Sequence, residues 1–112
     1  MAQLINIAHV LDIIEQNRRH TIAQKKQEIL TLNKFLNETY DNLCAAFPDQ
    51  DQKETRYNAV RGTAEVTQAE QERLREEFEL AEVCVQTMLV DVTDAENKLF
   101  MLEGELNNLL AE

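Results

Sequence analysis

Residues 74–109, LREEFELAEVCVQTMLVDVTDAENKLFMLEGELNNL, decide the fold class of this 112-residue chain. Apolar residues recur there at alternating spacings of three and four, which is the pattern that supercoils one helix against another. The same spacing extends back to Tyr57, with Thr67 and Gln71 as the polar members. We call these positions the C-terminal seam: Tyr57, Val60, Ala64, Thr67, Gln71, Leu74, Phe78, Ala81, Val85, Met88, Val92, Ala95, Leu99, Leu102, Leu106 and Leu109. The spacing predicts a long helix that packs against a partner helix.

The strongest helix-breaking signal is the segment 47–51, FPDQD, which holds the only proline of the chain. Proline lacks a backbone donor and disfavours helix at the residue before it, so the first helix is expected to stop there. Asp51 followed three residues later by Glu54 is a plausible N-cap with a reciprocal acid. These signals predict helix one at about 3–47, a turn at 48–51 and helix two at about 52–111.

Helix one has a less regular pattern. Leu4, Ile7, Leu11 and Ile14 begin a three-four spacing that reaches Arg18, resumes four residues later at Ile22 and runs on to Leu43. The extra four-residue step indicates a stutter, which is a local unwinding of the supercoil. The stretch 16–28 is mostly polar, so helix one alone would supply a weak core.

Composition agrees with regular helix, because 44% of the residues are hydrophobic while only two are Gly and one is Pro. Only 5% are aromatic and Trp is absent, which favours a thin aliphatic seam and disfavours a deep ligand pocket. We therefore predict a single all-α domain over residues 1–112. The expected fold is an antiparallel, coiled-coil-like hairpin of two long helices that assembles into a four-helix bundle.

A turn centred near residues 49–50 would place Arg18 near Ala81 and Lys25 near Leu74. The basic middle of helix one would then face an acidic run in helix two, and opposite charges would help to select this register. Two independently solvated charged faces are the alternative interpretation. The residues expected to match in charge are Arg18 and Lys25 with Glu76, Glu77, Glu79 and Glu82.

Under these bounds helix two is longer than helix one, so its last turns would lack a partner within the chain. Those turns are rich in large apolar residues, which would form an adhesive patch if exposed together. We expect association through the C-terminal half, as a homodimer or with a different helical protein. The predicted interface comprises Met88, Val92, Leu99, Phe100, Met101, Leu102, Leu106, Leu109 and Leu110.

The sequence lacks the patterns of a catalytic, cofactor or metal site. His9 and His20 are about three helical turns apart, no Glu-x-x-His pair exists, and no Gly-rich loop could hold a phosphate. The net charge of −10 disfavours nucleic acid, and the acidic excess lies after Pro48. Cys44 and Cys84 form no CxxC and are expected to be small buried hydrophobes. We therefore expect a non-enzyme with no cofactor, metal or small-molecule substrate.

No apolar run is long enough to span a membrane and no export signal is recognisable, so a cytoplasmic protein is expected, with leaderless secretion still open. Three functions remain. The first is a self-associating coiled-coil scaffold or subunit of a larger assembly. The second is a small acidic chaperone or adaptor for an amphipathic helical partner, for example in secretion or assembly, and the third is an acidic inhibitor of a basic surface.

Overall fold

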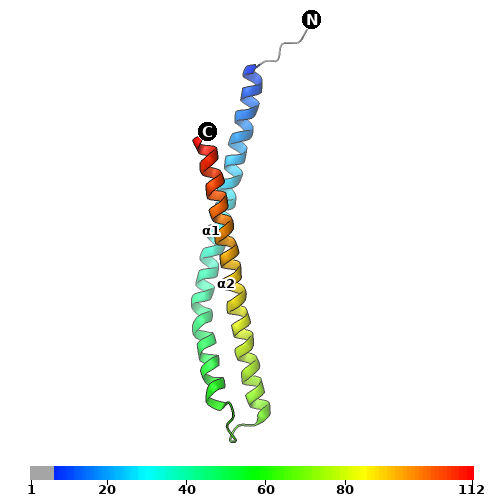
Figure 1. Ribbon diagram of the computed structural model, residues 1–112, viewed down its shortest axis with the longest axis vertical. Helices are drawn as coiled ribbons and strands as arrows, with labels where there is room; N and C mark the ends of the chain where they lie inside the picture. Colours follow the sequence, from blue (N-terminus) through cyan, green and yellow to red (C-terminus); the bar gives the residue numbers. More distant parts are fainter. Residues whose placement is uncertain (1–6) are drawn as a thin grey trace. The chain divides into compact units, whose positions relative to one another are not determined.

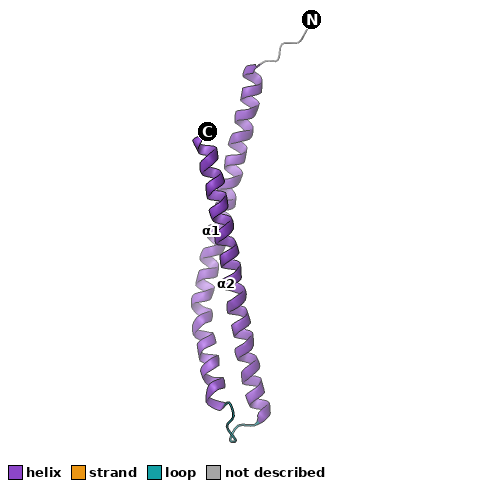
Figure 2. Ribbon diagram, viewed as in Figure 1, coloured by secondary structure: helices purple, strands orange, loops and turns teal. Residues whose placement is uncertain are grey.

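The computed structural model describes residues 7–112, which form two helices that run antiparallel to each other (Figure 1). Helix α1 spans Ile7–Val60 and helix α2 spans Gln68–Ala111. Residues 7–112 contain no strand (Figure 2). The prediction of an all-α, two-helix hairpin is confirmed, while its assembly into a four-helix bundle stays a prediction. The expected start of helix one near residue 3, with Leu4, lies outside the described residues.

The chain divides into two compact units, each built from one segment of α1 and one segment of α2. Unit 1 joins the part of α1 up to Lys34 with Asn97–Glu112, and unit 2 is Phe35–Glu96, which includes the turn. Both units use the same packing pattern, with one stripe of α1 against one stripe of α2. The single-domain assignment stays a prediction.

The predicted turn at 48–51 is wrong, because α1 continues through Pro48 to Val60. The reason is a seam on α1 that keeps the alternating spacing across the proline. Its members are all buried or half-buried: Arg18, Ile22, Lys25, Ile29, Leu32, Leu36, Thr39, Leu43, Ala46, Gln50, Lys53, Tyr57 and Val60. Pro48 is exposed and lies between Ala46 and Gln50, on the face of α1 directed away from α2. The donor that proline lacks would have bonded the carbonyl of Cys44, which also lies on the exposed side.

The turn lies instead at residues 61–67 and has its own local signals. Gly62 has a φ of 74°, a left-handed conformation that suits glycine just after a helix end. Thr67 precedes α2, and its hydroxyl accepts a hydrogen bond from the backbone N–H of Glu70 at 3.2 Å, as an N-cap does. Thr67-x-x-Glu70 has the spacing of a capping box. These residues, and not Asp51 and Glu54, start the second helix.

Gln71 fixes this turn from within α2. Its side-chain amide donates to the carbonyls of Thr63 at 2.9 Å and Val66 at 3.1 Å, and its carbonyl oxygen accepts from the N–H of Gly62 at 3.2 Å. The two polar residues that interrupt the apolar C-terminal seam, Thr67 and Gln71, therefore both serve the turn. Their polarity marks where the chain reverses.

The C-terminal seam is confirmed from Gln71 to Leu109, where every member is buried or half-buried. Its first four predicted members lie elsewhere, because Tyr57 and Val60 belong to α1 while Ala64 and Thr67 lie in the turn. The core is thin, and Val85, at 2% exposure, is its most buried residue. Most of the buried residues lie in unit 2: Leu36, Thr39, Leu43, Ala81, Val85, Val92 and Ala95.

Candidate protein interaction surfaces

The apolar residues predicted to form an interface fall into two groups. Val92 and Leu102 are buried, and Met88, Leu99, Leu106 and Leu109 are half-buried, as members of the seam that faces α1. The expectation that the C-terminal turns lack a partner within the chain is therefore wrong, because the later turn makes α1 long enough to cover them. Phe100, Met101 and Leu110 lie outside the seam and are exposed, so a role for them in binding another chain stays a prediction.

The predicted charge matching between the helices is also wrong. Arg18 does not face Ala81 but donates from Nη2 to the carbonyl of Leu109 at 2.7 Å. That carbonyl is among the last four of α2, which have no helical partner, and a cation is favourable at this end of a helix. Lys25 pairs with Glu105 at 2.5 Å. Both basic residues thus contact the C-terminal end of α2 within unit 1.

The acidic residues at the start of α2 interact mainly within their own helix. Arg73 pairs with Glu70 and, at 2.6 Å, with Glu77. Arg75 pairs in the same way with Glu72 and, at 2.9 Å, with Glu79. Hydrogen bonds from the two guanidinium groups lower the pKa values of Glu70 and Glu72. The contribution of these pairs to stability is present above the ordinary carboxyl pKa and is lost as the pH falls through the lowered values.

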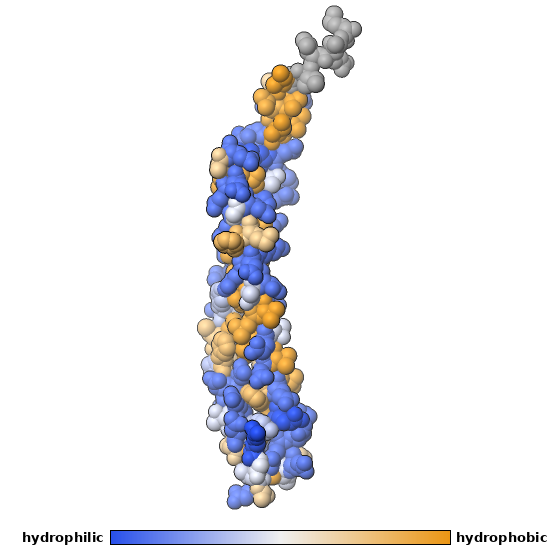
Figure 3. All heavy atoms as spheres, in the orientation of Figure 1, coloured by the Kyte–Doolittle hydropathy of each residue, from blue (hydrophilic) through white to orange (hydrophobic). Residues whose placement is uncertain are grey.

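The first apolar surface is Ile7–Ile14, which we call the N-terminal segment. Since α2 ends at Ala111 and Leu109 already faces Arg18, the N-terminal segment projects beyond the end of α2 within unit 1 (Figure 1). All of its residues are exposed, and Ile7 reaches 70%. Figure 3 shows apolar side chains gathered at this end of α1, next to the grey atoms. The unpaired apolar end of the hairpin is therefore on α1, not on α2.

A second apolar surface lies along one side of unit 2. The phenol of Tyr40 donates to Glu96, which fixes the local pairing of the two helices. One heptad further along α1 is Phe47, and one heptad back along α2 is Leu89, so the antiparallel pairing places these two residues opposite each other. Tyr40, Phe47 and Leu89 are each partly exposed, and we call this group the lateral face.

The hydrogen bond between Tyr40 and Glu96 also raises the pKa of the Tyr40 phenol, because the carboxylate accepts a hydrogen bond from the protonated phenol and opposes a second negative charge. Since the folded pKa exceeds the unfolded one, the bond stabilises the hairpin at neutral pH. That contribution is lost as the pH rises through the raised value.

In a Tyr57→Phe background Tyr40 is the only phenol, because the chain has two tyrosines. Glu96→Gln should then lower the pKa of Tyr40 toward its ordinary value, since the charged acceptor is gone. Ultraviolet titration of phenolate absorbance measures this, with Glu103→Gln as the control. Equal titration midpoints in the parent and in Glu96→Gln would show that Tyr40 and Glu96 do not pair.

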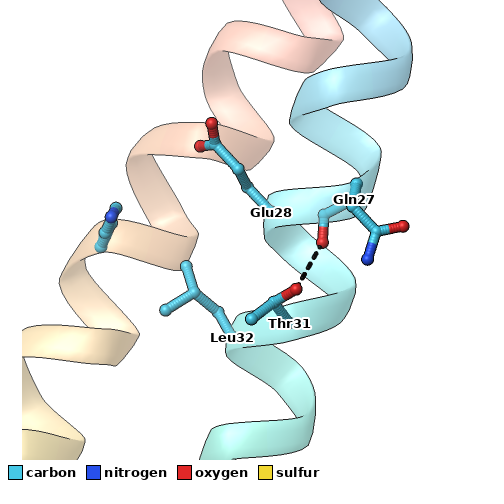
Figure 4. A pocket seen from close by; sticks show the side chains of 5 residues that line it. Gln27, Glu28, Thr31 and Leu32 are labelled. Carbon is cyan, nitrogen blue, oxygen red and sulfur yellow. Dashed lines mark hydrogen bonds between the residues drawn. The ribbon is translucent and has the colours of Figure 1, made fainter.

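Two hollows on the surface are open to solvent and do not enclose a ligand. One, of about 390 Å³, is lined by Glu76, Glu79, Leu80 and Val83 on α2. Another, of about 190 Å³, lies in unit 1, where Figure 4 shows Glu28, Thr31 and Leu32 along α1. There the Thr31 hydroxyl donates to the carbonyl of Gln27 at 3.0 Å, so it is engaged within its own helix. Neither hollow gathers groups that suggest chemistry.

Within residues 7–112, no three His, Cys, Asp or Glu side chains gather where they could hold a metal ion. Over the same range neither helix has a stretch apolar and uncharged enough to cross a membrane. Both cysteines are free and exposed, so the expectation that Cys44 and Cys84 are buried is wrong. Each lies outside its helix's seam, where the partner helix does not cover it.

Comparison with known proteins identifies no relative: no family model, no curated protein and no solved structure matches the chain.

Sequence reasoning missed both apolar surfaces for one reason. Ending the first helix before Pro48 shortened it, which moved the apparent overhang to α2 and placed Phe47 at the end of the helix. The signals for the correct ending were present in Gly62 and in Thr67-x-x-Glu70. With the turn placed there, the apolar run at the start of α1 becomes the part without a partner.

Proposed function

We propose that this chain is a non-enzymatic helical interaction module that self-associates, as a scaffold or as a subunit of a larger assembly. The observation that supports this most directly is the exposure of large apolar side chains outside the seam. Ile7 and Leu11 are exposed on the N-terminal segment, and Phe100 is 78% exposed on α2. Apolar side chains clustered in this way usually mark a surface that another protein covers.

The shape of the site favours helix binding over small-molecule binding. Small-molecule sites are concave and surround most of their ligand, whereas the apolar groups here lie on convex helix surfaces. A helix surface with anchors three and four residues apart is suited to another helix. The N-terminal segment has this form, with Ile7, Val10, Leu11 and Ile14 as its anchors.

The two alternative functions differ in the partner. An adaptor would use the same apolar surfaces for a different helical protein. An acidic inhibitor would need free negative charge, and its support is weaker because Arg73 and Arg75 already pair with four of the nearby acids. Self-association is the proposal that requires no second kind of protein.

The test is light-scattering mass after size exclusion over a dilution series from high to low micromolar, with helical circular dichroism on each sample. A mass that exceeds 13.0 kDa at high concentration and falls on dilution is expected, with helical content retained. A folded species of 13.0 kDa at every concentration would rule out self-association and would favour the adaptor.

A further inference from the structure

The N-terminal segment is an exposed helix surface. It runs from Ile7, the first residue that the structure describes, and ends short of Arg18, where α1 meets the last turn of α2. Eight residues at the rise of an α-helix extend about 12 Å. Beside these two turns, α2 is absent because it ends at Ala111. Among residues 7–112, none occupies the place of a partner helix next to the segment and in line with α2.

The composition of the segment suits burial against an apolar partner. Five of its eight residues are large aliphatics that are 40–70% exposed: Ile7, Val10, Leu11, Ile13 and Ile14. Asp12 is its only acid, and it has no Lys or Arg. A partner of high charge would meet a single carboxylate, whereas a second aliphatic helix would bury this surface.

The segment is also its own mirror image in apolar pattern. At equal numbers of residues before and after the bond between Val10 and Leu11, the two residues are either both apolar or both polar. The mirrored pairs are Val10 with Leu11, His9 with Asp12, Ala8 with Ile13, and Ile7 with Ile14. In a twofold interface, residue i contacts residue j and residue j contacts residue i, so a segment with this symmetry can pair with its own copy.

We propose that a second copy of the chain covers the N-terminal segment, with the two segments antiparallel about a twofold axis between Val10 and Leu11. This rests on the proposed self-association and names its surface. The second copy's α1 occupies the open place beyond Ala111 and runs in the same direction as α2. Ile7 of each copy then packs beside Ile14 of the other, and Val10 packs beside Leu11.

The size of this interface sets its strength. A stable dimer buries about 800 Å² on each partner, and two helical turns supply less than that. The dimer is therefore weak and dissociates on dilution, which the concentration series detects as a gradual change of mass.

Disulfide trapping tests the antiparallel geometry directly. In a Cys44→Ser, Cys84→Ser background, Leu11→Cys places a thiol next to the twofold axis, within reach of the same residue in the second copy. Mild oxidation should convert most of this variant to a covalent dimer. Leu80→Cys, at a position that is 67% exposed against 58% for Leu11 but lies on α2, is the control and should remain monomeric.

A charge placed in the segment tests its contribution to association. Leu11→Asp should lower the apparent association constant at least tenfold with unchanged helical content, because its carboxylate would be buried between two aliphatic helices. Val90→Asp, an exposed apolar position on α2, is the control and should associate as the parent does.

The outcomes separate this inference from the proposed function. Association that persists in Leu11→Asp, or that is lost in Phe47→Asp on the lateral face instead, would overturn the inference and leave self-association intact. Failure of Leu11→Cys to cross-link while the parent associates would overturn the antiparallel geometry. A parent that is monomeric at every concentration would overturn both.

Discussion

Val85→Asp should lower the free energy of unfolding by about 3–5 kcal/mol, enough to leave much of the hairpin unfolded at room temperature. Val85 is the most buried side chain, at 2% exposure, and lies in the middle of the seam of unit 2. The new carboxylate would lose its hydration at a buried position between the two helices. A core this thin has few other contacts to offset the loss.

Val83→Asp is the matched control, because it makes the same substitution two residues away on the same helix. Val83 is 60% exposed, so its carboxylate would remain hydrated and stability should change by less than about 1 kcal/mol. Urea unfolding monitored by circular dichroism measures both variants. Equal losses at the two positions would mean that Val85 does not face α1.

Pro48→Ala should stabilise the hairpin by up to about 3 kcal/mol, the usual penalty for proline inside a helix. Pro48 lies within α1 and on its exposed face, so the substitution restores a backbone hydrogen bond and removes no seam contact. Asp41→Ala, one heptad earlier on the same exposed face, is the control and should change stability by less than about 1 kcal/mol.

The sign of the Pro48→Ala effect distinguishes two structures. If Pro48 lay in a turn, alanine would raise the conformational entropy of the unfolded chain and destabilise the protein by about 0.4–1 kcal/mol. Destabilisation in urea unfolding would therefore contradict the long first helix. Stabilisation supports a helix that is continuous from Ile7 to Val60.

The sequence predicted the fold class and the seam of α2 because burial against a partner helix imposes a periodic pattern over many turns. From Leu74 to Leu109 that pattern is almost wholly apolar and could be followed without ambiguity. The seam of α1 was harder to follow, because its members include Lys25, Gln50 and Lys53. Long polar side chains can lie along a seam with their polar ends in solvent, so their chemical type does not reveal their position.

The position of the turn was mispredicted because local and tertiary preferences disagree at Pro48. A proline penalty of about 3 kcal/mol favours a break, but the seam on both sides of Pro48 packs against α2 and outweighs it. The true turn has weaker individual signals, since a single glycine such as Gly62 or a single threonine such as Thr67 does not by itself end or begin a helix. Their combination within six residues, next to the polar Gln71, was more informative than the single proline.

The predicted interface on the last turns of α2 depended on a turn at 48–51, so it changed when the turn was found at 61–67. The principle that an uncovered apolar end promotes association still applies, but the uncovered end is Ile7–Ile14 and not the last turns of α2. Only the exposed residues outside the seam, Phe100, Met101 and Leu110, remain available from the original set.

The pairing of α1 with α2 determines both where the turn lies and which residues of α1 extend beyond α2. Spin labels at Asn17→Cys and Asn108→Cys, both exposed positions in unit 1, report on it in a Cys44→Ser, Cys84→Ser background. Labelled protein is diluted with unlabelled protein, so that double electron–electron resonance spectroscopy measures only distances within one chain. Labels on neighbouring helices should give a distance below about 25 Å. A distance of about 40 Å, expected from the rise per residue if the chain reversed at Pro48, would contradict the pairing and the uncovered segment with it.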